Sequence, residues 1–499
     1  MEMWSMIGCA VTGFLICWWL IPVLQRRVAQ AGHRDFHHEP SAGVSRFGGV
    51  GIFSAFAVVS VVAAALHSFE PLQHAQTWGV LLGALAMFGL GWRDDCKPIG
   101  AKLKLVGQIV IAGGVFWSGV QIDQFREPLT GTAYQLGPWS FPATVFWLVA
   151  LTNLINLIDG IDGLAGGIAL MLMGLLACFG FTHDPFSLLL TVGAAGAILG
   201  FLCYNFPPAK IYMGDGGAYF LGFLIGALTI TSSHKGTIAA GLIAPLFALA
   251  LPIADVLLAI LRRGLQGLPI FRPDRKHIHH RLVEFGLTRR GAVLVLYGLS
   301  LSCSVLALVV FWSRGQLAPI LVGALFLLFF FSARLFGFVK DWHAIGRELG
   351  ISLSLRKETR YALTLCEWLE LEAERCESLQ ELWTTYLFIT RKLGLAQVKL
   401  VLEDGRKVTR EQAGSGQTDF HRHRRELPLA NIRAIEFASE SSAMSPRLFE
   451  HLTELAAEAW MKAVHRWQDV NRMAAVFEPA VPSETTFFSR GRALISNVA

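Results

Sequence analysis

Amide and carboxylate side chains interrupt an otherwise apolar stretch at residues 153–164. Asn156, Asp159 and Asp162 follow one another at intervals of three, so on one continuous helix they would form a single polar stripe. The flanking runs are apolar enough to cross a membrane, where uncompensated charge is costly. The stripe therefore predicts a polar partner, such as a cation, a phosphorylated substrate or a water-filled cavity. The alternative is a helix cap or a packing network between helices.

Further motifs elsewhere in the chain carry charged, amide or histidine side chains. They are Asp94-Asp95; residues 204–210, with Asn205 and Lys210; Asp215 among Gly214, Gly216 and Gly217; and residues 275–281, with Arg275, His277, His279 and His280. Each motif falls at the same side of the predicted membrane spans. We therefore expect all of them to gather at one surface.

The chemistry that this set favours is phosphoryl transfer assisted by a divalent metal ion. Mg²⁺ takes oxygen ligands, usually one or two carboxylates together with substrate phosphates. Asp215 is the predicted metal ligand, and the neighbouring glycines would let the backbone and the helix N–H groups approach a pyrophosphate. The alternative for Asp215 is a helix N-cap.

The acidic pair and the histidine cluster are each ambiguous alone. Asp94-Asp95 is also typical of a solvated turn. On a helix the two side chains would point in different directions. One of them could then orient or deprotonate an acceptor phosphate while the other holds a cation or a lysine. The cluster at His277, His279 and His280 could bind zinc, but no cysteine accompanies it. The flanking arginines and lysine favour a phosphate or sugar clamp.

The elements that must position these residues are membrane helices. Hydrophobic residues make up 53% of the 499 residues and charged residues 16%, which excludes an ordinary soluble protein. We predict an all-α polytopic membrane protein of about eleven transmembrane helices. The predicted spans are 3–22, 48–67, 76–92, 103–120, 140–158, 163–181, 186–204, 215–232, 236–261, 291–312 and 316–338.

Lysine and arginine gather in the loops that follow odd-numbered spans. The positive-inside rule therefore places those loops, the motifs and the C-terminal region in the cytoplasm, and the N-terminus outside. The net charge of +6 is explained by cations that fix the membrane topology and attract anionic phosphate groups. No nucleic-acid partner is expected. The eight cysteines form no C-x-x-C pair, so neither a disulfide framework nor a thiolate metal site is indicated.

Together the motifs resemble those of the polyprenyl-phosphate N-acetylhexosamine-1-phosphate transferase family, in the family's order over about residues 1–338. The matching segments are Arg46–Gly49, Asp94-Asp95, 153–165, 204–215 and 273–280. The resemblance implies transfer of a sugar-1-phosphate from a UDP-sugar to undecaprenyl phosphate, with release of UMP and with Mg²⁺ or Mn²⁺ bound. It also implies a bacterial inner (plasma) membrane location and a role in the first membrane step of a cell-envelope polysaccharide.

The resemblance assigns roles to the motif residues. Asp215 matches the metal-binding aspartate, and Asp94 and Asp95 match the acidic pair near the acceptor phosphate, with Asp94 the preferred base if one acts. The polar segment with Asn156, Asp159 and Asp162 matches the region beside the nucleotide-sugar, and the histidine segment matches the loop that engages the donor. The His-Ile-His-His form resembles the branch that uses UDP-GlcNAc, and UDP-MurNAc-pentapeptide transfer is the alternative. We favour direct attack by the lipid phosphate over an aspartyl intermediate.

The composition becomes polar after residue 340, and residues 341–478 are predicted to form a small cytoplasmic α+β domain. A helix with Leu379, Trp383 and Tyr386 on one face, strands at 398–402 and within 427–437, and a helix from Ser445-Pro446 support this prediction. The domain is similar to a GAF-type sensor module and is expected to be regulatory, with an unknown ligand or partner. Residues 479–499 are predicted to be a flexible tail.

Two other classes of protein remain as alternatives. A transporter would also place polar residues in broken helices, but paired halves are common in transporters and the aspartate motifs do not repeat. A membrane receptor would explain the C-terminal domain and leave the acidic and histidine motifs without a role. A homodimer is allowed for, whichever class is correct.

Overall fold

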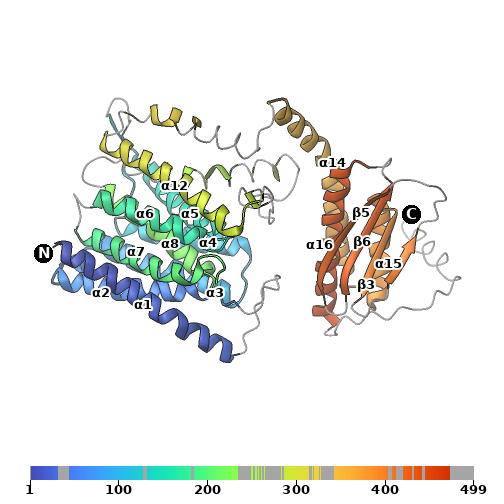
Figure 1. The fold of residues 1–499 in the computed structure, drawn as a ribbon, viewed down its shortest axis with the longest axis horizontal. Coiled ribbons are helices and arrows are strands. Elements are labelled where there is room, and N and C mark those ends of the chain that lie inside the picture. Colours follow the sequence, from blue (N-terminus) through green and yellow to red (C-terminus); the bar gives the residue numbers. More distant parts are fainter. Residues whose placement is uncertain are drawn as a thin grey trace. The chain divides into compact units, whose positions relative to one another are not determined.

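The computed structural model describes residues 2–31, 44–126, 132–180, 185–233, 286–313, 342–402, 407–411, 420–429, 432–440 and 444–471, with separate short stretches within 249–283 and 317–327. Two compact units make up the chain (Figure 1). The first continues to Gly346, and the second takes up the chain at Arg347.

The first unit is built from long apolar helices. They occupy the first eight predicted ranges and the tenth, whereas the predicted spans 236–261 and 316–338 lie largely outside the described residues. Within the described residues, 6 helices are long and apolar enough to cross a membrane, so the chain is a membrane protein and the number of eleven spans stays a prediction. The helices are α1 Glu2–Ala31, α2 Gly48–Leu66, α3 Ala75–Cys96, α4 Ala101–Trp117, α5 Ser140–Ile158, α6 Leu164–Gly180, α7 Pro185–Asn205, α8 Gly214–Ser233 and α12 Arg289–Trp312.

Helix α8 lies at the centre of this unit and packs against α2, α3, α5 and α6. Beyond Asp215 almost every side chain on its circumference is buried, including Tyr219, Phe220 and Phe223. A helix that is apolar all round is stable only when other helices surround it. Because α2, α3, α5 and α6 all pack against α8, this helix determines where their polar ends lie.

Small residues set the distances between neighbouring helices. A Cβ atom at Gly196 of α7 would lie 2.0 Å from the carbonyl oxygen of Ala10 in α1, and a Cβ at Gly222 of α8 would lie 2.6 Å from that of Leu151 in α5. Close backbone approach of this kind is how membrane helices associate, because apolar surface alone gives them no preference for protein over lipid. Larger side chains at these positions would force the helices apart.

A short antiparallel hairpin connects α4 to α5, formed by β1 Gln124–Arg126 and β2 Ala133–Gln135. The sequence analysis treated this connection as a loop. Each strand is only three residues long, and all three residues of β2 are exposed. Neither strand therefore has an apolar pattern from which the hairpin could have been predicted.

The second unit combines three helices with a four-stranded antiparallel sheet. Helices begin at Leu379 and at Pro446, where the sequence analysis expected them, and a strand covers residues 398–402; the strand Lys407–Glu411 had no counterpart in the sequence analysis. The strand order is β4-β3-β6-β5. The elements are α14 Trp342–Glu372, α15 Leu379–Lys392, β3 Gln397–Leu402, β4 Lys407–Glu411, β5 Phe420–Leu429, β6 Ile432–Glu440 and α16 Pro446–Asn471.

This unit has a hydrophobic core of its own. The rings of Trp383 and Tyr386 on α15 lie 5.2 and 4.9 Å from the ring of Trp460 on α16, and the Tyr386 hydroxyl donates to the carbonyl of Ala456 at 3.0 Å. Apolar residues of β3 and β6 complete the cluster. A hydrophobic core of its own is what allows a domain to fold independently.

Candidate active site

The polar motifs that the structure describes meet at one end of the helical unit. This end contains the last turns of α3, α5 and α7 and the first turns of α4, α6, α8 and α12. The connections are linked directly: the N–H of Gly163 donates to Asn205 Oδ1 at 2.9 Å, and the N–H of Ala209 donates to Asp162 Oδ2 at 2.9 Å. The predicted convergence of these motifs on one surface is therefore observed among the described residues.

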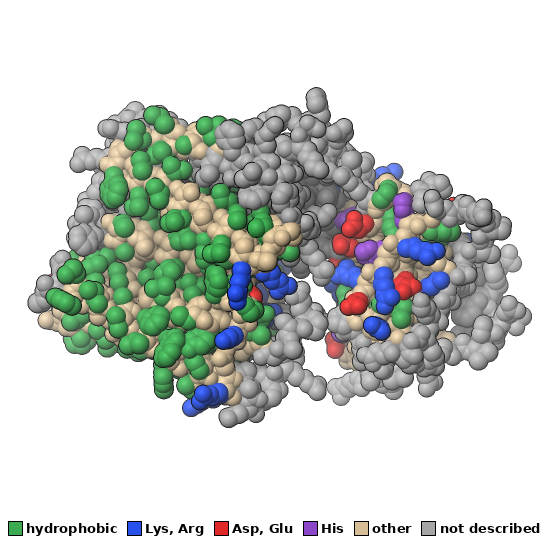
Figure 2. Space-filling model, viewed as in Figure 1, with side chains coloured by type: hydrophobic (Ala, Val, Ile, Leu, Met, Phe, Trp, Pro, Cys, Tyr) green, Lys and Arg blue, Asp and Glu red, His purple; other side chains and the backbone are tan. Residues whose placement is uncertain are grey.

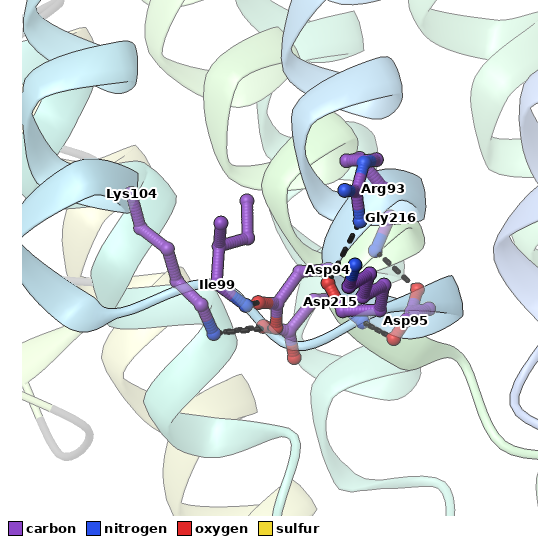
Figure 3. A network of polar contacts seen from close by, with 8 residues as sticks. Arg93, Asp94, Asp95, Ile99, Lys104, Asp215 and Gly216 are labelled. Carbon is purple, nitrogen blue, oxygen red and sulfur yellow. Dashed lines mark hydrogen bonds and ion pairs between the residues drawn. The ribbon is translucent and has the colours of Figure 1, made fainter. Parts of the chain in front are cut away.

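Asp94 is held at the end of α3 by two interactions. Its Oδ1 atom accepts from the N–H of Ile99 at 2.7 Å, which closes the turn into α4, and its Oδ2 atom pairs with the ammonium group of Lys104 (Figure 3). Only 3% of the side chain is exposed. Asp94 is therefore a buried, fully partnered carboxylate.

Lys104 also reaches the carboxylate of Asp215, with Nζ and Oδ2 3.1 Å apart (Figure 3). The Asp215 side chain is 24% exposed, against 3% for Asp94, so of the two carboxylates it is the one that solvent and ligands can reach. The sequence analysis expected a cation or a lysine beside the acidic pair but did not single out Lys104. The available signal was its position in the first turn of α4, directly after the turn that Asp94 closes.

Asp95 has a different role from its neighbour, since it caps α8. Its two carboxylate oxygens accept from the N–H groups of Asp215 and Gly216, each at 2.9 Å (Figure 3). The two side chains of the acidic pair therefore point in different directions, as expected: Asp94 pairs with Lys104, and Asp95 accepts from the first N–H groups of α8. These first helix N–H groups were predicted to face a substrate anion, and that expectation is corrected: a protein carboxylate already occupies them.

The glycines around Asp215 serve helix packing. A Cβ atom at Gly217 would lie 2.8 Å from the Cα of Gly49 in α2, and one at Gly91 of α3 would lie 2.3 Å from the carbonyl oxygen of Asp215. Gly214 has a φ of +74°, which a side chain would strain. These glycines bring α2 and α3 against the start of α8, which differs from the predicted approach to a pyrophosphate.

The polar stripe predicted for a single helix is not formed. Helix α5 ends at Ile158, Asp159 is its C-cap, and Asp162 lies in the turn before α6. Glycine favours helix ends, and Gly163 adopts a φ of +78° that an L-residue in a helix could not. Asn156, in the last turn of α5, is half-buried.

Asp159 still belongs to the carboxylate cluster. Burial, followed by the nearby carboxylates of Asp215 and Asp95, raises the pKa of Asp159 well above its usual range, and the charge of Arg46 opposes this shift. The carboxylates of Asp159, Asp215 and Asp95 are therefore close enough for their charges to interact.

The remaining predicted residues divide into structural, exposed and undescribed groups. Asn205 is buried, and its amide also donates to the carbonyl of Ile211 at 2.8 Å, so it holds the connection from α7 to α8. The side chain of Lys210 is exposed, while its backbone carbonyl accepts from Gln25 at 2.6 Å. The predicted donor-binding residues Arg275, His277, His279 and His280 lie outside the described residues.

Two further contacts were not foreseen from the sequence. Gln108, one turn beyond Lys104 on α4, is buried and its Oε1 accepts from the amide of Asn153 at 2.6 Å. At the start of α12, Arg290 Nε donates to the carbonyl of Pro207 at 2.6 Å. The first contact ties α4 to α5, and the second ties α12 to the connection that follows α7.

The carboxylates are compatible with a divalent metal ion, although the described residues contain no group of three His, Cys, Asp or Glu side chains arranged to hold one. Asp94 and Asp215 already attract one cation, the ammonium group of Lys104. Mg²⁺ commonly takes one or two protein carboxylates and completes its shell with water and substrate phosphates. The exposed carboxylate of Asp215 meets that requirement, so the donor set fits.

Comparison with known proteins agrees with this arrangement. Residues 77–233, which include the acidic pair and Asp215, match the model of glycosyl transferase family 4. The chain is 35% identical over 283 residues to a protein of Bacillus subtilis named "Probable undecaprenyl-phosphate N-acetylglucosaminyl 1-phosphate transferase", covering 56% of this chain and 76% of the relative.

Relatives from other bacteria cover a similar share of the chain. A decaprenyl-phosphate N-acetylglucosaminephosphotransferase of Mycolicibacterium smegmatis is 32% identical over 59% of this chain and 78% of its own length. A phospho-N-acetylmuramoyl-pentapeptide-transferase of Bacillus pumilus is 29% identical over 62% of this chain and 94% of its own length. The chain therefore belongs to glycosyl transferase family 4, the family of the polyprenyl-phosphate N-acetylglucosamine-1-phosphate transferases.

Proposed function

We propose that this protein transfers N-acetylhexosamine-1-phosphate, in particular GlcNAc-1-phosphate, from a UDP-sugar to undecaprenyl phosphate. The observation that carries the proposal is the accessible Asp215 carboxylate, held beside Lys104 and Asp94 at the end of a membrane-helix bundle. The relatives named for N-acetylglucosamine-1-phosphate transfer support the donor and the polyprenyl acceptor. The relative named for N-acetylmuramoyl-pentapeptide transfer is less similar, at 29% identity, so that donor remains the second candidate.

In the reaction, an oxygen of the lipid phosphate attacks the β-phosphorus of the UDP-sugar. The bond from that phosphorus to the bridging oxygen breaks, and UMP leaves. A phosphate monoester has a second pKa of about 6, so near neutral pH the acceptor is largely a dianion and needs little help from a base. The contacts of Asp94 with Ile99 and Lys104 favour its charged form, so they make the predicted base a weak one.

The chain's own residues supply charge and position. Lys104 can interact with an incoming phosphate while Asp94 holds its ammonium group in place, and Asp95 fixes the main chain of Asp215 through the α8 cap. Asp215 would hold Mg²⁺ or Mn²⁺, with the carboxylate of Asp159 nearby. When bound, the metal ion would neutralise charge on the donor pyrophosphate.

UMP release tests the proposal directly. Purified full-length protein is incubated with UDP-GlcNAc, undecaprenyl phosphate and Mg²⁺, and UMP and the lipid pyrophosphate-sugar are quantified, with a parallel reaction in EDTA. We expect both products in equal amounts and none in EDTA. If UDP-GlcNAc gives no UMP, UDP-GalNAc and UDP-MurNAc-pentapeptide are tested as donors. Absence of UMP with all three would refute the assignment and favour a transporter or a receptor.

The membrane orientation is a further part of the proposal. We place the site and the second unit in the cytoplasm and the hairpin β1–β2 outside, in the bacterial inner membrane, because the loops at the site carry most of the lysines and arginines. Single cysteines introduced at Gln124 and at Lys97 in a cysteine-free variant should differ in labelling by an impermeant maleimide. Gln124→Cys is expected to react in intact spheroplasts, and Lys97→Cys only after the membrane is opened. The reverse pattern would overturn this orientation.

A further inference from the structure

Arg46 opens the motif Arg46–Gly49 and lies in the short segment that precedes α2. The main chain on both sides of it is bonded to the segment that precedes α8. The N–H of Tyr212 donates to the carbonyl of Ser45 at 2.8 Å, and the N–H of Gly48 donates to the carbonyl of Tyr212 at 2.9 Å. Arg46 is therefore held at a fixed place beside the start of α8.

This place is next to the proposed metal ligand. A Cβ atom at Gly214 would lie 2.3 Å from the carbonyl oxygen of Arg46, so the two main chains are in contact one residue before Asp215. The guanidinium charge of Arg46 also acts on Asp159, because it opposes the rise in the pKa of that carboxyl group. Arg46 therefore brings a positive charge to the carboxylate cluster.

The charge of Arg46 is available to a ligand, in contrast to the charge of Lys104. Lys104 already pairs with Asp94 and Asp215. The guanidinium group of Arg46 is half-buried, and within the part of the chain that the structure describes it forms no ion pair. Partial burial of a charge costs free energy unless an opposite charge compensates for it. A bound anion would supply that compensation.

The chemistry of the side chain identifies the kind of anion. A guanidinium group presents its N–H donors in a planar fork, which matches two oxygens of one phosphate group. Phosphates that approach Asp159 and Asp215 are repelled unless cations lie beside them. Figure 2 shows lysine and arginine side chains at one end of the visible face of the first unit, whereas hydrophobic side chains cover most of the rest. A concentration of positive charge of this kind attracts anionic substrates.

We propose that Arg46 is a phosphate-binding residue of the transferase, and that its guanidinium group donates to two oxygens of one substrate phosphate. The donor pyrophosphate and the phosphate of the lipid acceptor share this chemistry, and the experiment below distinguishes them. The inference rests on the proposed function. It adds a second cation to the site, one whose charge is not shared with Asp94 and Asp215 as that of Lys104 is.

Substrate affinities of two Arg46 variants test the assignment. Arg46→Gln removes the charge, and Arg46→Lys keeps the charge without the fork; both keep the main-chain bonds of the segment, since none of these bonds uses the side chain. Calorimetric titration of the purified full-length protein with UDP-GlcNAc, without acceptor, reports on the donor. The KM for undecaprenyl phosphate at saturating donor reports on the acceptor.

We expect Arg46→Gln to weaken one of these two constants by about 10- to 100-fold, the usual effect of losing hydrogen bonds to a charged group. Arg46→Lys should weaken the same constant by only about fivefold, because the charge remains. The substrate whose constant changes carries the phosphate that Arg46 binds, and a change in both constants would place the guanidinium group between the two phosphates. The control Arg26→Gln removes an exposed arginine near the end of α1 and should leave both constants unchanged.

Two different failures can be told apart. If the wild-type protein binds UDP-GlcNAc and releases UMP, and Arg46→Gln has the same two constants, Arg46 does not bind phosphate. The same conclusion follows if Arg46→Gln lowers only the melting temperature or kcat, because the guanidinium charge then merely balances the carboxylates. A wild-type protein that neither binds a UDP-sugar nor releases UMP would instead refute the transferase function, and this inference with it.

Discussion

Asp215→Asn should abolish turnover, with the rate of UMP release falling by about 10³-fold or more while the protein stays folded. The substitution keeps the volume of the side chain and an oxygen that can accept from Lys104. The α8 cap is also kept, because Asp95 binds the main-chain N–H of Asp215 and not its side chain. What is lost is the accessible negative charge proposed to hold the metal ion.

The measurement is UMP release at saturating donor and acceptor over a series of Mg²⁺ concentrations, together with the melting temperature in detergent. Glu70→Gln provides a matched control, since it removes an exposed carboxylate from the connection between α2 and α3. The control should retain wild-type rates. Wild-type activity of Asp215→Asn at high Mg²⁺ would remove Asp215 from the metal site.

The helices and the convergence of the motifs could be predicted because both depend on local patterns. Apolar runs of membrane length mark the helices, and alternating crossings place every second connection on the same side. Asp94, Asp159, Asn205 and Asp215 stand at the ends of such runs, so knowledge of the helix boundaries alone was enough to bring them together.

The partners of individual side chains could not be predicted in the same way. The sequence cannot show that Asp95 receives N–H groups 120 and 121 residues away, or that Lys104 links α4 to Asp215. Spacing alone was also misleading for Asn156, Asp159 and Asp162. Intervals of three suggest one face of a helix even where the helix has already ended, as α5 does at Ile158. Gly160 and Gly163 were the available warning that it does not.

The glycines near Asp215 illustrate a second limit. Glycine beside an aspartate is compatible with ligand approach and with helix packing, and both need the absence of a Cβ atom. The choice depends on which backbone lies opposite, here Gly49 for Gly217 and Trp92 for Gly216. That information is long-range, so only the folded structure separates the two interpretations.

Asp95→Asn is expected to lower stability and activity together, which distinguishes it from Asp215→Asn. Asparagine keeps one of the two acceptor oxygens, so one N–H group at the start of α8 loses its partner. The loss of a helix cap costs about 1 kcal/mol, and Asp95→Ala, which removes both acceptors, should cost about 2 kcal/mol. The melting temperature in detergent should therefore decrease in the order wild type, Asp95→Asn, Asp95→Ala.

Activity of the Asp95 variants should follow from the displacement of Asp215. A loosened α8 terminus no longer fixes that carboxylate beside Lys104, and loss of such a supporting contact typically costs about 10- to 100-fold in metal affinity or activity. Raising Mg²⁺ should recover part of the rate for Asp95→Asn, but none for Asp215→Asn, because only the former keeps the carboxylate. If Asp95→Asn is instead inactive at every Mg²⁺ concentration and melts at the wild-type temperature, Asp95 acts on the substrate, as the acidic pair alone suggested, and the cap is secondary.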